Sequence, residues 1–189
     1  MSNRKYVKDF ANLGYLPLTA NDAGTYTTGT TYTAIPGAQS CSVDDNKEDY
    51  EILADDGVWD SGADWTGTDL VIVIAETELE LLSNIIGSDF SDGVLEEATT
   101  DDAPEIALTF SGLLANGGYR LFRYYCCKCT GYKLSHTTKG QNRDAQNYEL
   151  SFKVMPRKLD QHIRGIKDVA AGDSLAWLKS ITTVANGGG

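Results

Sequence analysis

The chain has 189 residues, 41% of them apolar, which fits one globular domain with flanking arms. The longest fully apolar run, residues 70–75, is far too short for a membrane-spanning helix, and the N-terminal residues lack the apolar stretch of a secretory signal. The net charge of -11 argues against a nucleic-acid groove or an anionic membrane as a partner, because both attract surplus Lys and Arg.

The charge is unevenly distributed along the chain. Residues 44–105 contain 20 acidic residues and one basic residue, whereas the remainder contains 7 acidic and 15 basic residues, so the two parts carry −19 and +8. Such a distribution fits an acidic surface kept soluble by repulsion, or a head-to-tail assembly in which an acidic face meets a basic face of the next copy. The sequence leaves both interpretations open.

Alternating apolar and polar residues between turn signals predict a mainly-β fold, an antiparallel β-sandwich with one short flanking α-helix and extended arms. We expect an N-terminal arm over residues 1–10, a β-sandwich domain over 11–158, and a C-terminal arm with a short helix over 159–189. Within the domain, residues 20–33 and 44–66 are expected to be loops, because the first is rich in Thr, Gly and Tyr without a period and the second is too acidic for a core.

The central part of the chain gives the clearest local predictions. The apolar run 70–74 predicts a strand covered on both faces, and residues 78–86 predict a helix, with a capping box of Thr77 and Glu80 and with Gly87 at its C-terminal end. Residues 105–110 and 119–136 predict a hairpin around Asn116-Gly117-Gly118, whose long second strand should bend near Gly131.

The C-terminal third predicts one strand and one helix. Residues 148–154 alternate as a strand with one wet and one dry face, and Pro156 ends the alternation. The spacing of apolar residues over 174–181 predicts a short helix with Asp173 as its cap.

No residue pattern in the chain is typical of an active site. Cys126, Cys127 and Cys129 lack the two-residue spacer and the second ligand pair of a zinc site, so we expect free thiols packed in a strand, with Cys126 on the opposite face to the other two. His136 and His162 are expected in exposed loops. The acidic run 44–49 lacks the glycine and terminal glutamate of a calcium loop. We therefore expect neither an enzyme nor a bound metal or cofactor.

The order of several segments resembles a known family, the major tail proteins, or tail tube proteins, of long-tailed bacteriophages with non-contractile tails. The resemblance spans about residues 10–185 and depends on the order of its segments, each unspecific alone; the three cysteines are not part of it. Those segments are Asn-Leu-Gly-Tyr-Leu-Pro-Leu-Thr at 12–19, Ala-Ile-Pro-Gly-Ala at 34–38, 39–43, Tyr-Glu-Ile-Leu-Ala-Asp-Asp-Gly-Val-Trp at 50–59, Ile-Ile-Gly at 85–87, Asp-Gly-Val-Leu at 92–95, Pro-Glu-Ile-Ala-Leu-Thr-Phe at 104–110, Tyr-Arg-Leu-Phe-Arg-Tyr-Tyr at 119–125 and Glu-Leu-Ser-Phe-Lys-Val at 149–154.

The resemblance implies a structural virion protein, assembled in the cytoplasm of a bacterial host, whose hexameric rings stack into the tail tube that conducts DNA from capsid to host. Its implied partners are further copies of itself, the tape-measure protein, and the terminator and distal tail proteins at the tube ends. DNA would pass only transiently, because an acidic lumen repels phosphates within about 8 Å at physiological salt. No membrane partner is implied.

Contacts between subunits are expected where acidic loops meet the basic stretch near the C-terminus. The candidate contact residues are Trp59, Trp65, Asp55, Asp56, Arg157, Lys158, Arg164 and Lys167. The alternative function is a carbohydrate-binding or adhesin-like β-sandwich, in which Trp59, Trp65 and nearby carboxylates form a sugar platform.

Overall fold

The structure, a computed structural model, describes residues 6–55, 57–75, 77–134, 147–182 and 184–185. Most strands in this part of the chain join one antiparallel ten-stranded sheet, whose main hydrogen-bonded order is β12-β2-β1-β8-β9-β10-β5-β4, with β11 on β9 and β3 on β1. The strands of the sheet are β1 Val7–Asn21, β2 Thr25–Thr28, β3 Thr33–Ala34, β4 Ala38–Ala54, β5 Gly57–Ile74, β8 Glu105–Leu114, β9 Tyr119–Leu134, β10 Tyr148–Met155, β11 Arg164–Val169 and β12 Val184–Ala185.

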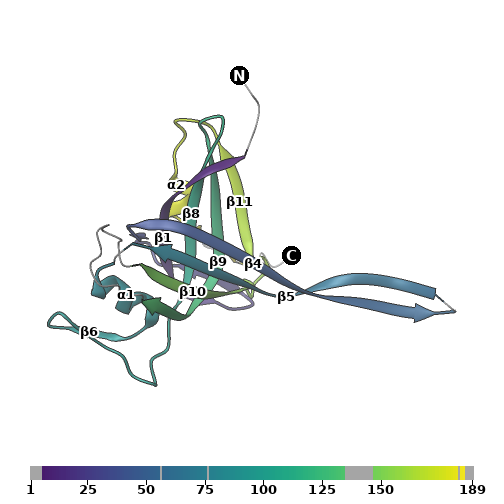
Figure 1. Cartoon of the computed structure of the whole chain (residues 1–189), viewed down its shortest axis with the longest axis horizontal. Coiled ribbons are helices and arrows are strands. Elements are labelled where there is room, and N and C mark those ends of the chain that lie inside the picture. The colour runs from purple at the N-terminus through teal and green to yellow at the C-terminus, as the bar shows by residue number, and fades with distance from the viewer. Residues whose placement is uncertain (1–5, 56, 76, 135–146, 183, 186–189) are drawn as a thin grey trace, which may run out of the picture.

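Smaller elements complete the fold. The helices are α1 Leu79–Ile86 and α2 Ala176–Lys179, and β6 Asp89–Ser91 pairs with β7 Val94–Glu96 in a separate two-stranded sheet. The mainly-β antiparallel fold with a short flanking helix, predicted from the sequence, is confirmed (Figure 1). Its layers come from one curved sheet, because β1 contacts β4 although the two strands lie far apart in the hydrogen-bonded order.

The predicted hairpin of residues 105–136 is formed by β8 and β9. The Gly117 amide donates to the Leu114 carbonyl over 3.0 Å, and Gly117 has a φ of 87°, a conformation that favours glycine. The predicted bend near Gly131 is also present as a β-bulge: Ser151 of β10 is paired with Gly131 and Phe152 with Cys129, which leaves Thr130 unpaired.

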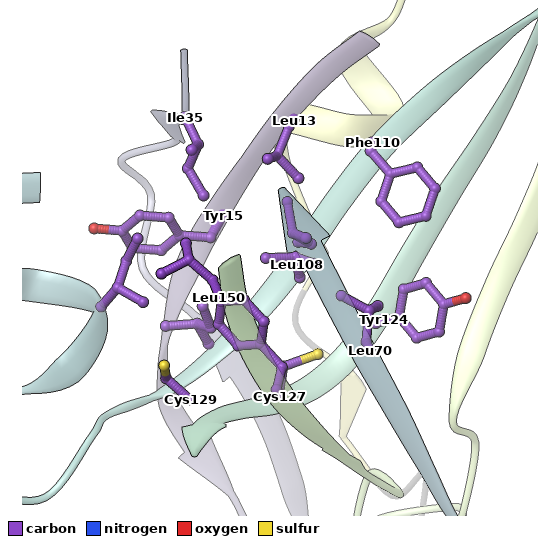
Figure 2. Packing of buried hydrophobic residues seen from close by; sticks show 14 of the residues in the cluster. Leu13, Tyr15, Ile35, Leu70, Leu108, Phe110, Tyr124, Cys127, Cys129 and Leu150 are labelled. Atoms are coloured by element: carbon purple, nitrogen blue, oxygen red, sulfur yellow. The ribbon is translucent and has the colours of Figure 1, made fainter. Parts of the chain in front are cut away.

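The main hydrophobic core lies on the inner face of the curved sheet. It is built from alternate residues of β1, β5, β8, β9 and β10 and is covered by Leu82 and Ile85 of α1. Figure 2 shows Leu13 and Tyr15 of β1 facing Leu150 of β10 across this core. In β5, Leu70, Ile72 and Ile74 are fully buried but the alternate valines are only half-buried, so the predicted covering of both faces is incomplete.

A second buried group lies on the outer face of β1, β8 and β9, under the segment that follows β10. Leu16, Tyr26, Leu121 and Cys126 are each 0% exposed and lie outside the inner core, and Leu178 of α2 is buried with them. The sheet is therefore packed on both faces in this region, which makes the C-terminal segment a covering layer.

Several segments that the sequence suggests to be arms or loops contain paired strands instead. Residues 7–10, expected in the N-terminal arm, pair with β8. The expected loop 20–33 contains β2, the expected loop 44–66 belongs to β4 and β5, and the expected arm 159–189 contains β11, which pairs with β9. The physical reason is the same each time: pairing with a neighbouring strand orders a segment that has no periodic apolar face of its own.

Both helices begin later than predicted, and α2 also ends earlier, at Lys179 and not at about residue 181. α1 ends, as expected, at Gly87, which has a φ of 79°. The capping box does not form, because within the described residues the Thr77 hydroxyl has no hydrogen-bond partner and the N-cap, Glu78, makes no side-chain cap bond. Asp173 does not cap α2; its carboxylate accepts from the Ala170 amide over 2.9 Å and closes the turn before it. In the described part of the chain no helix is long and apolar enough to cross a membrane.

Candidate assembly surfaces

The most distinctive surface of the molecule is the outer half of the β4–β5 hairpin, here called the distal hairpin (residues 47–65). Figure 1 shows this pair of strands projecting far from the body of the protein. It exposes five large apolar side chains, of which Trp59 is 74% and Leu53 72% exposed; the others are Tyr50, Ile52 and Val58. Asp55 is also exposed, next to the turn, and Asp56 lies outside the described residues.

The distal hairpin is held together by cross-strand pairing and not by a core. Pairing is continuous from Lys47 opposite Trp65 to Ala54 opposite Gly57, apart from a bulge at Trp59. Tyr50 lies over Gly62, since a Cβ there would meet the Tyr50 hydroxyl at 2.7 Å. Residues 47–65 contain seven acidic residues and only Lys47 as a base, a net charge of −6. The hairpin is thus an acidic rod with an apolar tip.

A chain of hydrogen bonds fixes the hairpin at its root. The Trp65 indole donates to the Thr68 hydroxyl over 3.0 Å, and that hydroxyl donates to Asp45 over 2.6 Å. Arg164 of β11 donates to both oxygens of Asp45, over 3.2 and 2.7 Å. The Thr68 hydroxyl and then Arg164 lower the pKa of Asp45 below its usual value. Trp65 and Arg164, both candidate contact residues, therefore have structural partners within their own subunit.

The two tryptophans of the expected sugar platform do not lie together. Trp65 is half-buried at the root of the hairpin, whereas Trp59 is exposed near the tip. Six residues of strand separate them, about 20 Å at roughly 3.3 Å per residue. The two rings cannot stack on one sugar, so this geometry gives no support to the carbohydrate-binding alternative.

The basic candidates fall into two groups. Lys158 and Lys167 are exposed and face solvent. Arg157, in contrast, is only 7% exposed, pairs with Asp160, and lies over the rings of Tyr26 and Tyr125 at 5.0 and 4.4 Å. The Asp160 pKa is held well below its usual value, mainly by the hydrogen bond from Arg157. Arg157 is part of the subunit's own packing, so reversing its charge would perturb folding before it tested assembly.

The other polar features singled out in the sequence are its clustered cysteines and its two histidines. Cys126, Cys127 and Cys129, here called the sheet cysteines, are free thiols buried in β9, with Cys127 and Cys129 in the inner core and Cys126 outside it, as predicted (Figure 2). Burial raises the pKa of Cys126 to about 12. His162 Nδ1 lies 2.7 Å from Asp160, and His136 is outside the described residues. Among the described residues, no group of three or more His, Cys, Asp or Glu side chains could hold a metal ion.

Comparison with known proteins gives a fold and no family. No protein-family model and no curated protein matches the chain. The chain is similar to the tube-terminating cap of the anti-feeding prophage, with a TM-score of 0.51 and 7% sequence identity over 89% of this chain and 95% of that chain. It also aligns with a chain of the anti-feeding prophage baseplate, with a TM-score of 0.43 and 7% identity over 91% of this chain and 99% of that one. At such identity the first match establishes a shared fold alone.

Proposed function

We propose that this chain is a structural subunit of a phage tail or a phage-tail-like particle, and that it self-associates through the distal hairpin. The observation that carries the proposal is the apolar tip of that hairpin, which is held about 30 Å from the body by strands of roughly 3.3 Å per residue. Soluble monomers rarely keep a projecting apolar surface of this kind without a partner. The fold shared with a tube-terminating cap supports the same assignment.

In the finer form of the proposal, six copies close into a ring and rings stack into a tail tube through which DNA passes. A projecting hairpin that binds a different surface of the next copy makes a head-to-tail contact, and such contacts generate rings or open helical filaments. The net charge of -11 favours passage of DNA without adhesion. The tape-measure protein and the proteins at the tube ends remain the proposed partners.

A second candidate is a terminator, a ring that caps a tube. It is favoured by the fold match to a protein described as a tube-terminating cap. The two candidates differ in what purified protein does on concentration. A tube subunit polymerises and its tubes lengthen, whereas a terminator stops at one ring. Negative-stain micrographs over a range of concentrations distinguish them.

The role of the hairpin is tested by shortening it. Replacing residues 48–64 by Asn-Gly leaves Lys47 opposite Trp65 across a two-residue turn and keeps the root intact. We expect this variant to fold and to sediment as a monomer, while the full chain forms rings or tubes. Assembly of the shortened variant to the same extent as the full chain, or a full chain that stays monomeric at every concentration, would contradict the proposal.

A further inference from the structure

An open groove of about 610 Å³ lies where the curved sheet fails to close, between the first residues of β1 and the first residues of β4. Its floor is aromatic: Phe110 lies 5.2 Å from Phe10 and 4.9 Å from Phe122, measured between ring centroids. Val7 and Val43, 43% and 37% exposed, form its two edges. Phe110 also belongs to the hydrophobic core and is labelled there in Figure 2, so the groove is continuous with the core. The groove is thus an apolar surface that opens to solvent.

The apolar surface extends from the groove onto β11. Ile166 is paired with Phe122 across β9 and β11, so the two side chains lie on the same face, and Ile166 is 54% exposed. Ion pairs lie on both sides of this strip: Arg164 with Asp45, and Arg120 with Asp168 at 2.7 Å. An apolar centre with a charged rim is the usual anatomy of a protein–protein interface.

The distal hairpin has the complementary properties. Its tip is apolar, and its net charge of −6 is opposite in sign to that of residues 157–179, which include β11 and carry +2. It cannot fill the groove of its own subunit, because Val43 and Leu53 lie on the same strand, β4, about 33 Å apart at roughly 3.3 Å per residue. The hairpin tip of one copy can therefore contact only the groove of another copy.

We propose that the groove and Ile166 receive the hairpin tip of a second copy, with Leu53, Val58 and Trp59 packed against Phe10, Phe122 and Ile166. This inference rests on the proposed function and adds the receiving surface to it. The contact is head-to-tail, since the tip and the groove are different surfaces, so each copy donates one tip and accepts another. The partner recognised by the groove is a second copy of this chain.

The test is cross-linking between the tip and the groove. In a Cys41→Ser background, which removes the thiol that lines the groove, the variants Val58→Cys and Ile166→Cys are combined in one chain and oxidised under mild conditions. Because the contact is head-to-tail, we expect a ladder of covalent oligomers beyond the dimer, reversed by reductant, and only dimers from a mixture of the two single variants. Val58→Cys with Val94→Cys is the matched control, because Val94 is 54% exposed, as is Ile166, and lies on β7.

The outcomes separate this inference from the proposed function. Electron microscopy could show assembly while the Val58→Cys/Ile166→Cys chain gives no ladder of covalent oligomers, or the control pair could give an equal ladder. Either result overturns the groove and Ile166 as the receiving surface, leaves the proposed function standing, and assigns the groove to another partner. Absence of any assembly overturns both. As a second measurement, Ile166→Asp should weaken self-association about tenfold or more without lowering the melting temperature, and an unchanged affinity would count against the groove.

Discussion

Replacing Arg157 by Met should destabilise the subunit strongly, although the sequence places this residue in a basic stretch that is expected to contact other subunits. Its guanidinium stacks on Tyr26 and Tyr125 and pairs with Asp160, and it lies 3.4 Å from His162 Nδ1. These contacts join the segment after β10 to the outer face of the sheet. Methionine keeps the apolar stem but removes the charge and every donor.

The size of the effect follows from these contacts. Two cation–π contacts contribute about 0.5–1 kcal/mol each, and hydrogen bonds to a charged group about 1.5–3 kcal/mol. Asp160 keeps 29% of its side-chain exposure, so water offsets part of the cost of leaving it unpaired. We expect a loss of about 2–4 kcal/mol in the free energy of unfolding, or roughly 5–15 °C in melting temperature. Urea denaturation followed by circular dichroism measures it, with exposed Lys158→Met, expected within about 0.5 kcal/mol of the parent, as control.

The same pair predicts a pH dependence. Because the Asp160 pKa is lowered in the folded state, its stabilising contribution is fully present above its unfolded pKa of about 4 and is lost as the pH falls toward the lower folded value. The difference between the parent and Arg157→Met should therefore be constant at pH 6–7 and shrink below about pH 4. An effect no larger than that of Lys158→Met, or one independent of pH in acid, would refute the structural role of Arg157.

Three further predictions concern the folded subunit. Gly87→Ala should lower the free energy of unfolding by about 1–3 kcal/mol, because its Cβ would lie 2.3 Å from the Asp102 carbonyl oxygen. Gly93→Ala is the control and should lower it less, because Gly93 has a similar φ but nothing lies within 4 Å of its Cβ. Equal losses in urea denaturation would contradict this prediction. The sheet cysteines should resist alkylation at pH 8 until the chain is unfolded, and their joint replacement by Ala should leave assembly intact at a cost of about 1–3 kcal/mol; stoichiometric zinc by elemental analysis would disprove the free-thiol assignment. Trp177→Ala should speed hydrogen exchange over residues 170–182 but not over β10. The reason is that the Arg123 guanidinium lies 3.9 Å from the Trp177 ring and donates to carbonyls of the α2 turn, so this ring helps to hold the turn on the sheet. Equal exchange in the parent and the variant would contradict this prediction.

The elements that the sequence predicted well are those with one buried and one exposed face. Strand β10 buries Leu150, Phe152 and Val154 and exposes or half-buries the residues between them, so its alternation in the sequence directly reflects the core. Helix α1 could likewise be predicted from the sequence, because the spacing of its apolar residues places Leu82 and Ile85 on one buried face. In both elements the packing and the local pattern carry the same information.

The distal hairpin and β11 could not be found in this way. From Lys47 to Ser61 nearly every side chain is exposed, so no burial pattern marks the strands, and backbone pairing alone orders them. Strand β11 is defined by its pairing with residues of β9 that lie 40 to 50 positions earlier in the chain. The groove depends on the curvature that brings β1 close to β4, a property of the whole sheet that no local pattern contains.

The candidate contact residues differ in whether the structure leaves them exposed. Trp59, Asp55, Lys158 and Lys167 face solvent and remain proposals for assembly. Composition could not show that Arg157 is buried, since a buried arginine and a surface arginine look alike in a basic stretch. Arg157 could have been recognised by its position over Tyr26 and Tyr125, but this requires knowing that the Tyr26 side chain of β2 packs against Tyr125 of β9.

The division of charge along the sequence is partly neutralised inside each subunit. Three ion pairs each join a basic side chain to the acidic part of the chain: Arg164 with Asp45, Lys153 with Asp69 and Lys128 with Asp102. Such exposed pairs contribute only about 0–1 kcal/mol each to stability.

The acids of the distal hairpin have no such basic partners nearby in the sequence, because Lys47 is the one base among residues 44–66. Salt therefore has two opposing effects on assembly: it screens repulsion between copies of net charge -11 and it screens attraction of the hairpin to basic surfaces. The exposed Lys158 and Lys167 test the contribution of charge as a whole, because reversing both to Glu increases the repulsion and removes attraction while leaving the buried Arg157 untouched. If charge contributes to assembly, the reversed variant should assemble less than the parent at low salt and recover toward it at about 1 M salt. Identical assembly of both proteins at every salt concentration would mean that apolar packing of the hairpin tip, and not charge, holds the copies together.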